Sequence, residues 1–283
     1  MLYGAIEAGG TKFVCAIVDE AGCVHSEVSL PTRDPELTLA DVAHFFREFS
    51  LTSISIGSFG PIELDLHKAN YGEILNSPKM LWKNFNIYRA LKTLFNIPIF
   101  LDTDVNMAAL GEYYWGAAKN KDSCLYITVG TGIGAGFVQR GETFKGRSHP
   151  EMGHIFVPRH NSDLFGGSCP YHQDCLEGLA SGSAIEARYG KKGNELQDNG
   201  EVWDLEAYYM AKAIVNYSLI LAPEIIILGG GVLKQSTLIP LIRSNVNKML
   251  NKYISINCME EYIVSPQLND KQAILGALAL GTK

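Results

Sequence analysis

The sequence lacks a long uncharged run of apolar residues. The longest candidate, residues 213–228, is interrupted by Asn216, Pro223 and Glu224, whereas a membrane helix needs about 20 consecutive apolar residues. The N-terminus also lacks a basic stretch followed by an apolar one, the pattern of a secretory signal. We therefore expect a cytoplasmic protein that has no membrane partner.

The sequence also lacks a large excess of charge of either sign. The 24 basic and 30 acidic residues give a formal net charge of −6, and they are interspersed without a basic stripe. This pattern argues against nucleic acid as a partner. Low-complexity segments and Pro- or Ser-rich linkers are also missing. With 283 residues, 47% of them apolar, the chain is long enough for one large domain or two modest ones with a sizeable core.

The order of apolar segments predicts an α/β protein. The segments EAGGTKFVCAIVD and TVGTGIGAGFVQR both read as strand, Gly/Thr turn, strand. They indicate either a duplication of about half the chain or two unrelated hairpins. We expect residues 142–199 to be irregular. Strands are expected at 2–7, 13–18, 24–30, 54–57, 97–101, 125–129, 134–138, 225–228 and 262–264, and helices at 36–49, 105–117, 201–221, 238–251 and 272–280.

Three glycine-rich turns could face a ligand. Glycine lets backbone N–H groups approach a phosphate closely, and Thr and Lys add further donors. None of the turns fits the Walker pattern or a dinucleotide fingerprint. The alternative interpretation is an ordinary tight turn, which is equally good for the third of them. The first two turns hold Gly9, Gly10, Thr11 and Lys12, and Gly130, Thr131, Gly132 and Gly134; the third holds Gly229, Gly230 and Gly231.

Two aspartates lie where an apolar strand ends and a helix begins. A carboxylate at the carboxyl end of a strand could take a proton from a substrate hydroxyl. The alternative role is capping of the helix N-terminus, which Asp favours. Capping is the preferred interpretation of Asp102, and for Asp104 the two interpretations compete.

Cysteine and histidine gather in one segment. Cys169, His172 and Cys175 form a C-x2-H-x2-C pattern that supplies three ligands to a tetrahedral zinc ion, with His154 upstream as the fourth. His149 and His160 compete for that fourth place. The flanking polar sequence cannot order itself by packing, so a structural zinc is expected. The alternative is a pair of idle surface thiols.

Taken together, these motifs resemble those of the ROK family, which contains bacterial sugar kinases and sugar-responsive repressors. The resemblance covers essentially the whole chain. The opening GAIEAGGTK and the C-x2-H-x2-C form are most similar to those of the family's bacterial fructokinases. The matching segments are EAGGTK from Glu7 to Lys12, Asp104-Val-Asn106, AALGE ending at Glu112, VGTGIGAG from Val129 to Gly136, Glu151-Met-Gly-His154, and the Cys/His segment that ends at Glu177.

The resemblance implies an actin-like, ribonuclease-H-like fold of two domains with the active site in the cleft between them. It places an N-terminal domain at residues 1–117, with a last helix at 268–283 packing back near it, and a second domain that carries the zinc loop at 118–267. It implies ATP-dependent transfer of a phosphoryl group to a free hexose by a homodimer, and the similarity to the fructokinases makes fructose the expected acceptor, with fructose 6-phosphate as the product. ATP would bind at the glycine-rich turns, with adenosine near Gly229–Gly231.

The resemblance also gives roles to individual residues. It makes Asp104 the catalytic base and implies that Asn106, Glu151, His154 and Glu177 bind the sugar. Glu7 stands where the family usually has Asp and would hold Mg²⁺ through water. The usual zinc motif of the family has three Cys residues; here a His replaces one of them, and imidazole suits zinc equally well.

Three rival functions follow from the same residues. Another hexose, such as glucose, mannose or an N-acetylhexosamine, could be the acceptor. A sugar-sensing repressor would need a DNA-binding segment, and only six residues precede Glu7. A non-catalytic sugar-binding module is the third possibility, and turnover of ATP with a panel of hexoses would exclude it.

Overall fold

The computed structural model describes residues 1–282 as two compact units. Of the described residues, the first unit comprises 1–120, 138–150 and 267–282, and the second comprises 121–137 and 151–266. The sequence had placed residues 138–150 with the second half of the chain. They belong to the first unit, where the hydroxyl of Thr143 donates a hydrogen bond to the carboxylate of Asp102.

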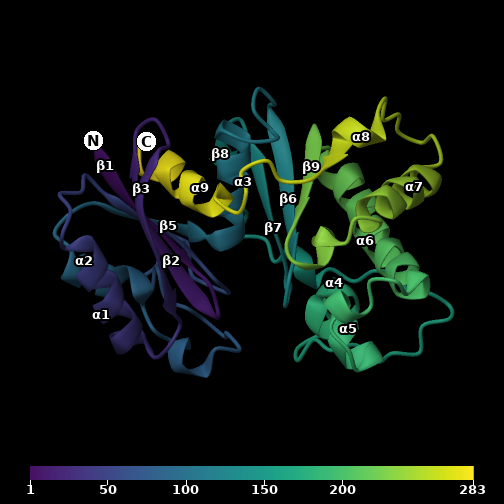
Figure 1. Cartoon of the computed structure of the whole chain (residues 1–283), viewed down its shortest axis with the longest axis horizontal. Coiled ribbons are helices and arrows are strands. Elements are labelled where there is room, and N and C mark those ends of the chain that lie inside the picture. Colours follow the sequence, from purple (N-terminus) through teal and green to yellow (C-terminus); the bar gives the residue numbers. More distant parts are fainter. Residues whose placement is uncertain (283) are drawn as a thin grey trace. The chain divides into compact units, whose positions relative to one another are not determined.

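The first unit is built on a five-stranded sheet in the order β3-β2-β1-β4-β5 (Figure 1). β1, β2 and β3 pair antiparallel, whereas β4 and β5 run parallel to β1. Successive side chains of β1 point to opposite faces and enter two separate cores. Ile6 packs with α1 and α2, and Ala5 packs with α3 and the C-terminal helix α9. The elements are β1 (Leu2–Ala8), β2 (Lys12–Asp19), β3 (Val24–Pro31), α1 (Pro35–Phe46), β4 (Ile54–Ser58), α2 (Ile87–Leu94), β5 (Ile99–Thr103), α3 (Asp104–Tyr114) and α9 (Gln272–Gly281).

Side-chain caps fix where the helices of this unit begin. Asp34 accepts a hydrogen bond from the N–H of Leu37 before α1, where Pro35 follows the cap. Asn86 caps α2, and Thr103 caps α3 by accepting from the N–H of Asn106. These side chains satisfy N–H groups that have no partner within the helix.

Glycine allows α9 to lie against α3, beside which it is drawn in yellow in Figure 1. A Cβ at Gly111 of α3 would come within 1.9 Å of the carbonyl oxygen of Gln272. A Cβ at Gly276 of α9 would come within 1.7 Å of the carbonyl oxygen of Met107. Neither position can hold a larger residue without moving a helix axis.

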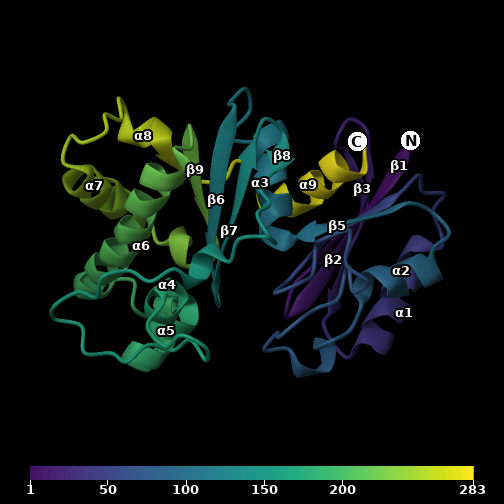
Figure 2. The ribbon, with the colours of Figure 1, turned by 180° about the vertical axis from the view of Figure 1, so that it is seen from behind.

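The second unit has its own five-stranded sheet, in the order β10-β9-β6-β7-β8 (Figure 2). Its main core joins Leu125 and Ile127 of β6 to apolar side chains of α6 and α7. The last residues of β7, with β8, carry the chain into the first unit. The elements are β6 (Ser123–Val129), β7 (Ile133–Gln139), β8 (Glu142–Thr143), α4 (Leu176–Ala180), α5 (Gly182–Tyr189), α6 (Gly200–Leu221), β9 (Ile225–Gly229), α7 (Leu238–Leu250), α8 (Met259–Tyr262) and β10 (Ile263–Val264).

The two sheets have the same plan. Each has a strand followed by a glycine turn and its partner strand, and then two strands parallel to the first, as β1, β2, β4 and β5 correspond to β6, β7, β9 and β10. This correspondence favours the duplication over two unrelated hairpins.

Most of the expected elements are present, with ends shifted by a few residues. Residues 142–199, expected to be irregular, contain α4 and α5. The helix α2 was not expected, and the strand expected at 262–264 starts one residue later, after the short helix α8. These short elements have too few residues for a periodic apolar pattern.

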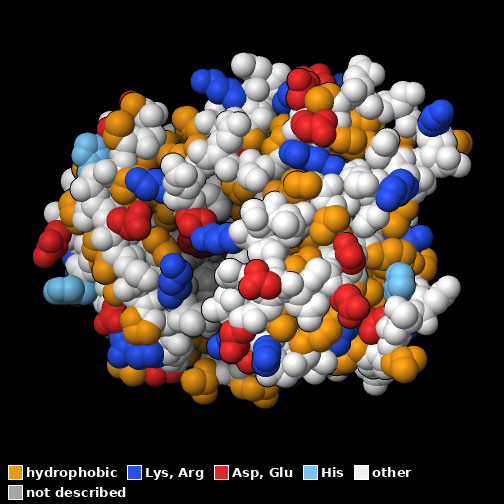
Figure 3. Space-filling model, turned by 45° about the vertical axis from the view of Figure 1, so that its right-hand side comes forward, with side chains coloured by type: hydrophobic (Ala, Val, Ile, Leu, Met, Phe, Trp, Pro, Cys, Tyr) orange, Lys and Arg blue, Asp and Glu red, His pale blue; other side chains and the backbone are white. Residues whose placement is uncertain are grey.

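The surface mixes charges of both signs, and Figure 3 shows acidic and basic side chains interspersed over the face that it displays. Within residues 1–282, no helix combines the length and the apolar character required to traverse a lipid bilayer.

A buried carboxylate ties together two segments of the first unit. The side chain of Glu112 on α3 is fully buried and accepts from the N–H groups of Ala117, Gln267 and Leu268 at 2.8–3.3 Å. Ala117 lies just before the chain leaves the unit, and Gln267 lies where it returns. Burial raises the pKa of Glu112, and the three N–H donors counteract this effect.

Replacing Glu112 with Gln should therefore destabilise the protein. The amide turns a donor toward N–H groups that need an acceptor, and such a loss costs about 1–3 kcal/mol. We expect urea-induced unfolding to begin at a lower concentration in Glu112→Gln. The exposed Glu48→Gln on the same unit is the matched control. Equal unfolding curves for the two variants would show that this carboxylate contributes little.

Candidate functional site

The turn between β1 and β2 presents free N–H groups. Gly9 closes the turn with a bond from its N–H to the carbonyl oxygen of Lys12 at 2.9 Å. Within the described part of the chain, the N–H groups of Gly10 and Thr11 have no hydrogen-bond acceptor. The hydroxyl of Thr32 on the neighbouring strand donates to the carbonyl oxygen of Gly9 at 2.7 Å and holds the turn in place. Two adjacent unpaired N–H groups suit an anion.

Lys79 lies against this turn, although no motif in the sequence marks it. A Cβ at Gly10 would be 2.8 Å from Cε of Lys79 and 3.6 Å from Nζ. The loop that carries Lys79 is anchored by the buried Trp82, whose Nε1–H donates to the carbonyl oxygen of Arg33 at 2.8 Å. The turn therefore has two lysines, Lys12 and Lys79, near its free N–H groups.

Glu7 lies near the end of β1, just before the same turn, and is partly buried. Burial raises the pKa of its carboxyl, while the charge of Lys12 lowers it; Asp270 and Glu27 raise it further. A cation beside this carboxylate would favour its ionised form.

Asp102 is the centre of a buried hydrogen-bond network. Its Oδ1 accepts from the N–H of Thr103 at 2.8 Å and from Nδ2 of Asn106 at 2.6 Å, and its Oδ2 accepts from the hydroxyl of Thr143 at 2.8 Å. Nζ of Lys145 lies 3.7 Å from Oδ2. The expectation that Asp102 caps the helix is wrong, because Thr103 is the cap and Asp102 still belongs to β5.

Asp104 is the first residue of α3, after the cap. Its Oδ1 accepts from the N–H of Val105 at 2.8 Å, and the side chain is only partly buried. Gly57 lets this helix end approach β4, since a Cβ there would be 3.1 Å from Cα of Asp104. Asn106 is 2% exposed and its amide is used by Asp102. The geometry thus leaves Asp104 partly exposed and buries Asn106 and Asp102.

The turn between β6 and β7 has the same free donors as the first one. Gly130 donates to the carbonyl oxygen of Gly132 at 2.9 Å, and within residues 1–282 the N–H groups of Thr131 and Gly132 have no acceptor. Thr131 is exposed, and Gly134 follows in β7. Each unit therefore has one Gly/Thr turn that could bind a phosphate.

Four side chains of the second unit form a cluster that could hold a metal ion. The ligand atoms of His154, Cys169, His172 and Cys175 all lie within 4.8 Å of one another. Nδ1 of His154 is 3.4 Å from Sγ of Cys175 and 3.7 Å from Sγ of Cys169. Tetrahedral zinc with bonds of about 2.0–2.3 Å requires ligand separations of roughly 3.3–3.8 Å. The donor set and the two separations from His154 therefore fit zinc.

The rivals for the fourth ligand position lie elsewhere. The ring of His160 contacts the hydroxyl of Ser162 at 2.8 Å and the ring of Tyr208, and His149 is not in the cluster. Burial raises the pKa of the Cys175 thiol to about 11 in the absence of a cation. A bound metal reverses this effect, because metal ligation requires the thiolate.

Two other predicted sugar-binding residues, Glu151 and Glu177, lie next to this cluster along the chain. Glu151 is exposed and begins the short turn that ends at His154, and Tyr217 of α6 holds that turn by donating to the carbonyl oxygen of Met152. Nε2 of His154 is 3.9 Å from Oε1 of Glu177. The structure thus brings His154 and Glu177 together.

Packing explains part of the third glycine turn. Gly230 has a φ of +94°, and a Cβ there would be 2.4 Å from the carbonyl oxygen of Val129. A Cβ at Gly229 would be 2.4 Å from the hydroxyl oxygen of Tyr126. Only Gly231 has open space around its Cα, so a tight turn accounts for the first two glycines.

A comparison with protein families identifies the chain. The model described as "ROK family" matches residues 3–283. The chain belongs to the ROK family.

Individual relatives of this ROK protein cover its whole length. It is 44% identical to a fructokinase of Pediococcus pentosaceus, over 99% of this chain and 97% of the relative. It is 42% identical to a fructokinase of Streptococcus mutans serotype c, over 100% of this chain and 98% of the relative. The crystal structure of a ROK hexokinase from Thermus thermophilus matches with a TM-score of 0.82 at 27% identity, covering 99% and 98% of the two chains. The predicted actin-like α/β fold of two units is thereby confirmed.

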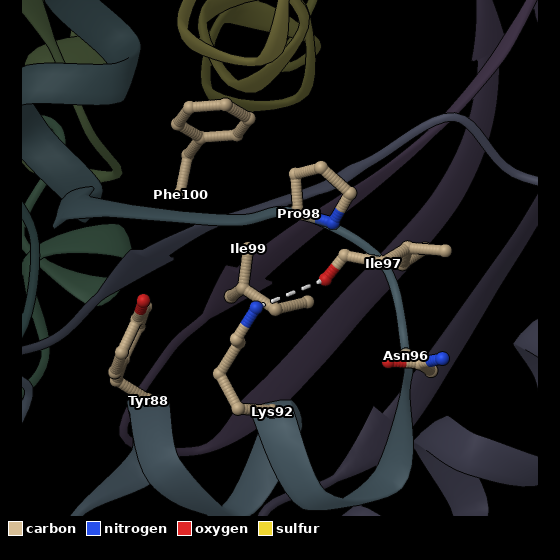
Figure 4. A pocket seen from close by; sticks show the side chains of 7 residues that line it. All are labelled: Tyr88, Lys92, Asn96, Ile97, Pro98, Ile99 and Phe100. Carbon is tan, nitrogen blue, oxygen red and sulfur yellow. Dashed lines mark hydrogen bonds between the residues drawn. The ribbon is translucent and has the colours of Figure 1, made fainter.

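A hollow at the edge strand β5 contains none of the predicted site residues of this ROK protein. It has a volume of about 450 Å³ and is lined by Tyr88 and Lys92 of α2 and by residues 96–100 (Figure 4). Nζ of Lys92 donates across it to the carbonyl oxygen of Ile97 at 3.4 Å. The walls of the hollow are largely apolar, and the ammonium group of Lys92 already donates to a carbonyl oxygen. The hollow therefore does not resemble the glycine turns, which have free N–H groups.

Proposed function

We propose that this protein phosphorylates fructose with ATP to give fructose 6-phosphate. The observation that carries the proposal is its identity of 42–44% to fructokinases over almost the full length of both chains. Two Gly/Thr turns with free N–H groups and a partly exposed Asp104 offer what phosphoryl transfer needs: charge neutralisation, positioning and a base.

The hexose acceptor is tested by a panel of sugars. With MgATP, the purified protein should have a higher kcat/KM for fructose than for glucose, mannose or an N-acetylhexosamine. A preference for glucose or N-acetylmannosamine would overturn the choice of sugar and leave the kinase assignment standing. Tight sugar binding without any ATP turnover would favour the non-catalytic alternative instead.

ATP is assigned to the glycine-rich turns. Its phosphates would contact the free N–H groups of Gly10, Thr11, Thr131 and Gly132, with Lys12 supplying charge. Adenosine would bind near Gly229–Gly231, where the space beside Gly231 is open. Mg²⁺ held through water by Glu7 would neutralise charge on the phosphates. Burial raises the pKa of Glu7, and a cation nearby would lower it again and favour the carboxylate that this role requires.

Asp104 is assigned as the general base. It starts a helix, so its position is fixed, and its side chain is not fully buried. The buried Asp102 holds Asn106 on the same helix turn and acts as a positioning residue rather than as a base. Glu151, His154, Glu177 and Asn106 complete the proposed sugar site.

Replacement of Asp104 with Asn keeps its shape and removes its ability to accept a proton. We expect kcat for fructose to fall by roughly 10²–10⁴-fold, the usual contribution of a general base. The fructose Kd, measured by calorimetry, should change much less because the amide still forms hydrogen bonds. The control is Asp204→Asn, an exposed residue of α6. A normal kcat in Asp104→Asn would assign the base to another residue.

Zinc is assigned to His154, Cys169, His172 and Cys175. Two thiolates and two imidazoles complete a tetrahedron and leave no open position, so the ion would order the loop and take no part in the transfer. This role suits a loop with exposed apolar side chains, such as Leu164 at 95% and Phe156 at 66% exposure, which lacks a core of its own.

Metal analysis of chelator-free protein should find about one zinc per chain, and turnover should still require added Mg²⁺. Cys175→Ser should lose the zinc, melt at a lower temperature and bind fructose more weakly. Cys23→Ser, an exposed cysteine outside the cluster, should keep all three properties. If Cys175→Ser loses zinc and keeps its melting temperature and fructose affinity, the cluster is incidental to the site.

A homodimer remains a prediction from the family resemblance, and a cytoplasmic location remains a prediction from the sequence. Light scattering at micromolar concentration measures the former directly.

A further inference from the structure

The β6–β7 turn is bound on one side by the segment that follows the metal cluster. The N–H of Gly182 donates to the carbonyl oxygen of Gly130 at 2.7 Å, and the N–H of Ser183 donates to that of Thr131 at 3.3 Å. Oε2 of Glu177 accepts from the N–H of Ile133 at 2.9 Å. Three hydrogen bonds thus connect Gly130, Thr131 and Ile133 to α4 and the start of α5.

The other side of the turn meets the segment just before His154. A Cβ at Gly153 would lie 1.8 Å from the carbonyl oxygen of Ile133. On the first side, a Cβ at Gly132 would lie 2.5 Å from Oε2 of Glu177, and one at Gly182 would lie 2.7 Å from the carbonyl oxygen of Gly130. The turn therefore has almost no freedom to shift unless these neighbours shift with it.

Both neighbours are attached to residues of the metal cluster. Gly153 directly precedes His154, and Cys175 is the residue before α4, two positions ahead of Glu177. The segments also contact each other, since the N–H of Leu176 donates to the carbonyl oxygen of Ile155 at 2.8 Å. Oε1 of Glu177 faces Nε2 of His154, while its Oε2 holds the turn.

We propose that the metal cluster positions the β6–β7 turn, so that metal occupancy sets nucleotide affinity as well as sugar affinity. Glu177, Gly153 and Gly182 transmit the position of the cluster to the free N–H groups of Thr131 and Gly132. This inference rests on the proposed binding of nucleotide phosphates at the turn. It makes Glu177 a positioning residue for the nucleotide in addition to its proposed contact with the sugar.

The first test measures nucleotide binding without sugar and without turnover. The Kd of a non-hydrolysable ATP analogue is determined by calorimetry for the wild type, for Cys175→Ser and for the control Cys23→Ser. Coupling between two sites typically changes affinity about 5–150-fold. We expect Cys175→Ser to bind the analogue at least fivefold more weakly and Cys23→Ser to bind it like the wild type.

Linkage supplies a readout that does not depend on any variant. If the metal tightens nucleotide binding, the nucleotide must tighten metal binding by the same factor. The affinity for zinc is measured by competition with a chelator in the presence and absence of saturating analogue. It should rise with the analogue by the factor found in calorimetry, and an unchanged zinc affinity overturns the proposal.

A pair of matched glycine variants separates the turn from the metal. Gly182 and Gly200 are both the first residue of a helix, and only Gly182 faces a nearby atom, because Gly200 has open space. Gly182→Ala should weaken binding of the analogue and keep the zinc, whereas Gly200→Ala should change neither. Equal nucleotide affinities for these two variants would contradict the proposed path.

The outcomes distinguish this inference from the proposed function. A wild-type protein that binds no nucleotide contradicts the proposed function itself. A wild-type protein that binds nucleotide equally well with and without zinc contradicts only the coupling. A wild-type protein that holds no zinc contradicts the coupling and the zinc assignment, and leaves the proposed phosphoryl transfer standing.

Discussion

The close approach of backbone to backbone at the β6–β7 turn is the constraint on which the proposed site of the second unit depends. Glycine alone fits at Gly153 and Gly182, where a Cβ would come within 1.8–2.7 Å of a carbonyl oxygen of the turn. Because each contact fixes another segment, the turn, the residues before His154 and the start of α5 form one rigid arrangement. A ligand at the turn would meet N–H groups that are already oriented, which lowers the entropic cost of binding.

In the first unit, buried carboxylates hold the proposed site residues in place. Asp102 collects three hydrogen bonds in the interior and fixes the start of α3, where Asp104 remains accessible. Glu112, two turns further along the same helix, binds the N–H groups of the segment that leads into α9. Both carboxylates are fully buried, and the hydrogen bonds that they accept offset the cost of removing them from water. One helix thus connects the proposed base to the packing of the C-terminal segment.

Much of the fold could be predicted from the sequence because its signals are local. The apolar runs of β1 and β2, the alternation in β3 and the glycine turns each depend on residues that are close together along the chain. The C-x2-H-x2-C spacing likewise sufficed to predict the residues of the metal cluster, which the structure brings together.

What escaped prediction depends on contacts between distant residues. Lys79 is 69 positions from Gly10, and no periodicity or motif marks it. Thr143 belongs to a segment after the second hairpin and still completes the network of Asp102 in the first unit. The capping role expected for Asp102 was wrong because Asp and Thr are both good caps, and only the backbone geometry shows that Thr103 occupies that position.

The most direct test of the account is the identity of the product. Phosphorus NMR of the protein with MgATP and fructose should show one phosphate monoester at the C6 hydroxyl, formed in step with ADP. That result is expected if Asp104 and the two glycine turns act on a sugar hydroxyl and water is excluded as the acceptor. Formation of ADP with inorganic phosphate alone, or no change in ATP, would contradict it.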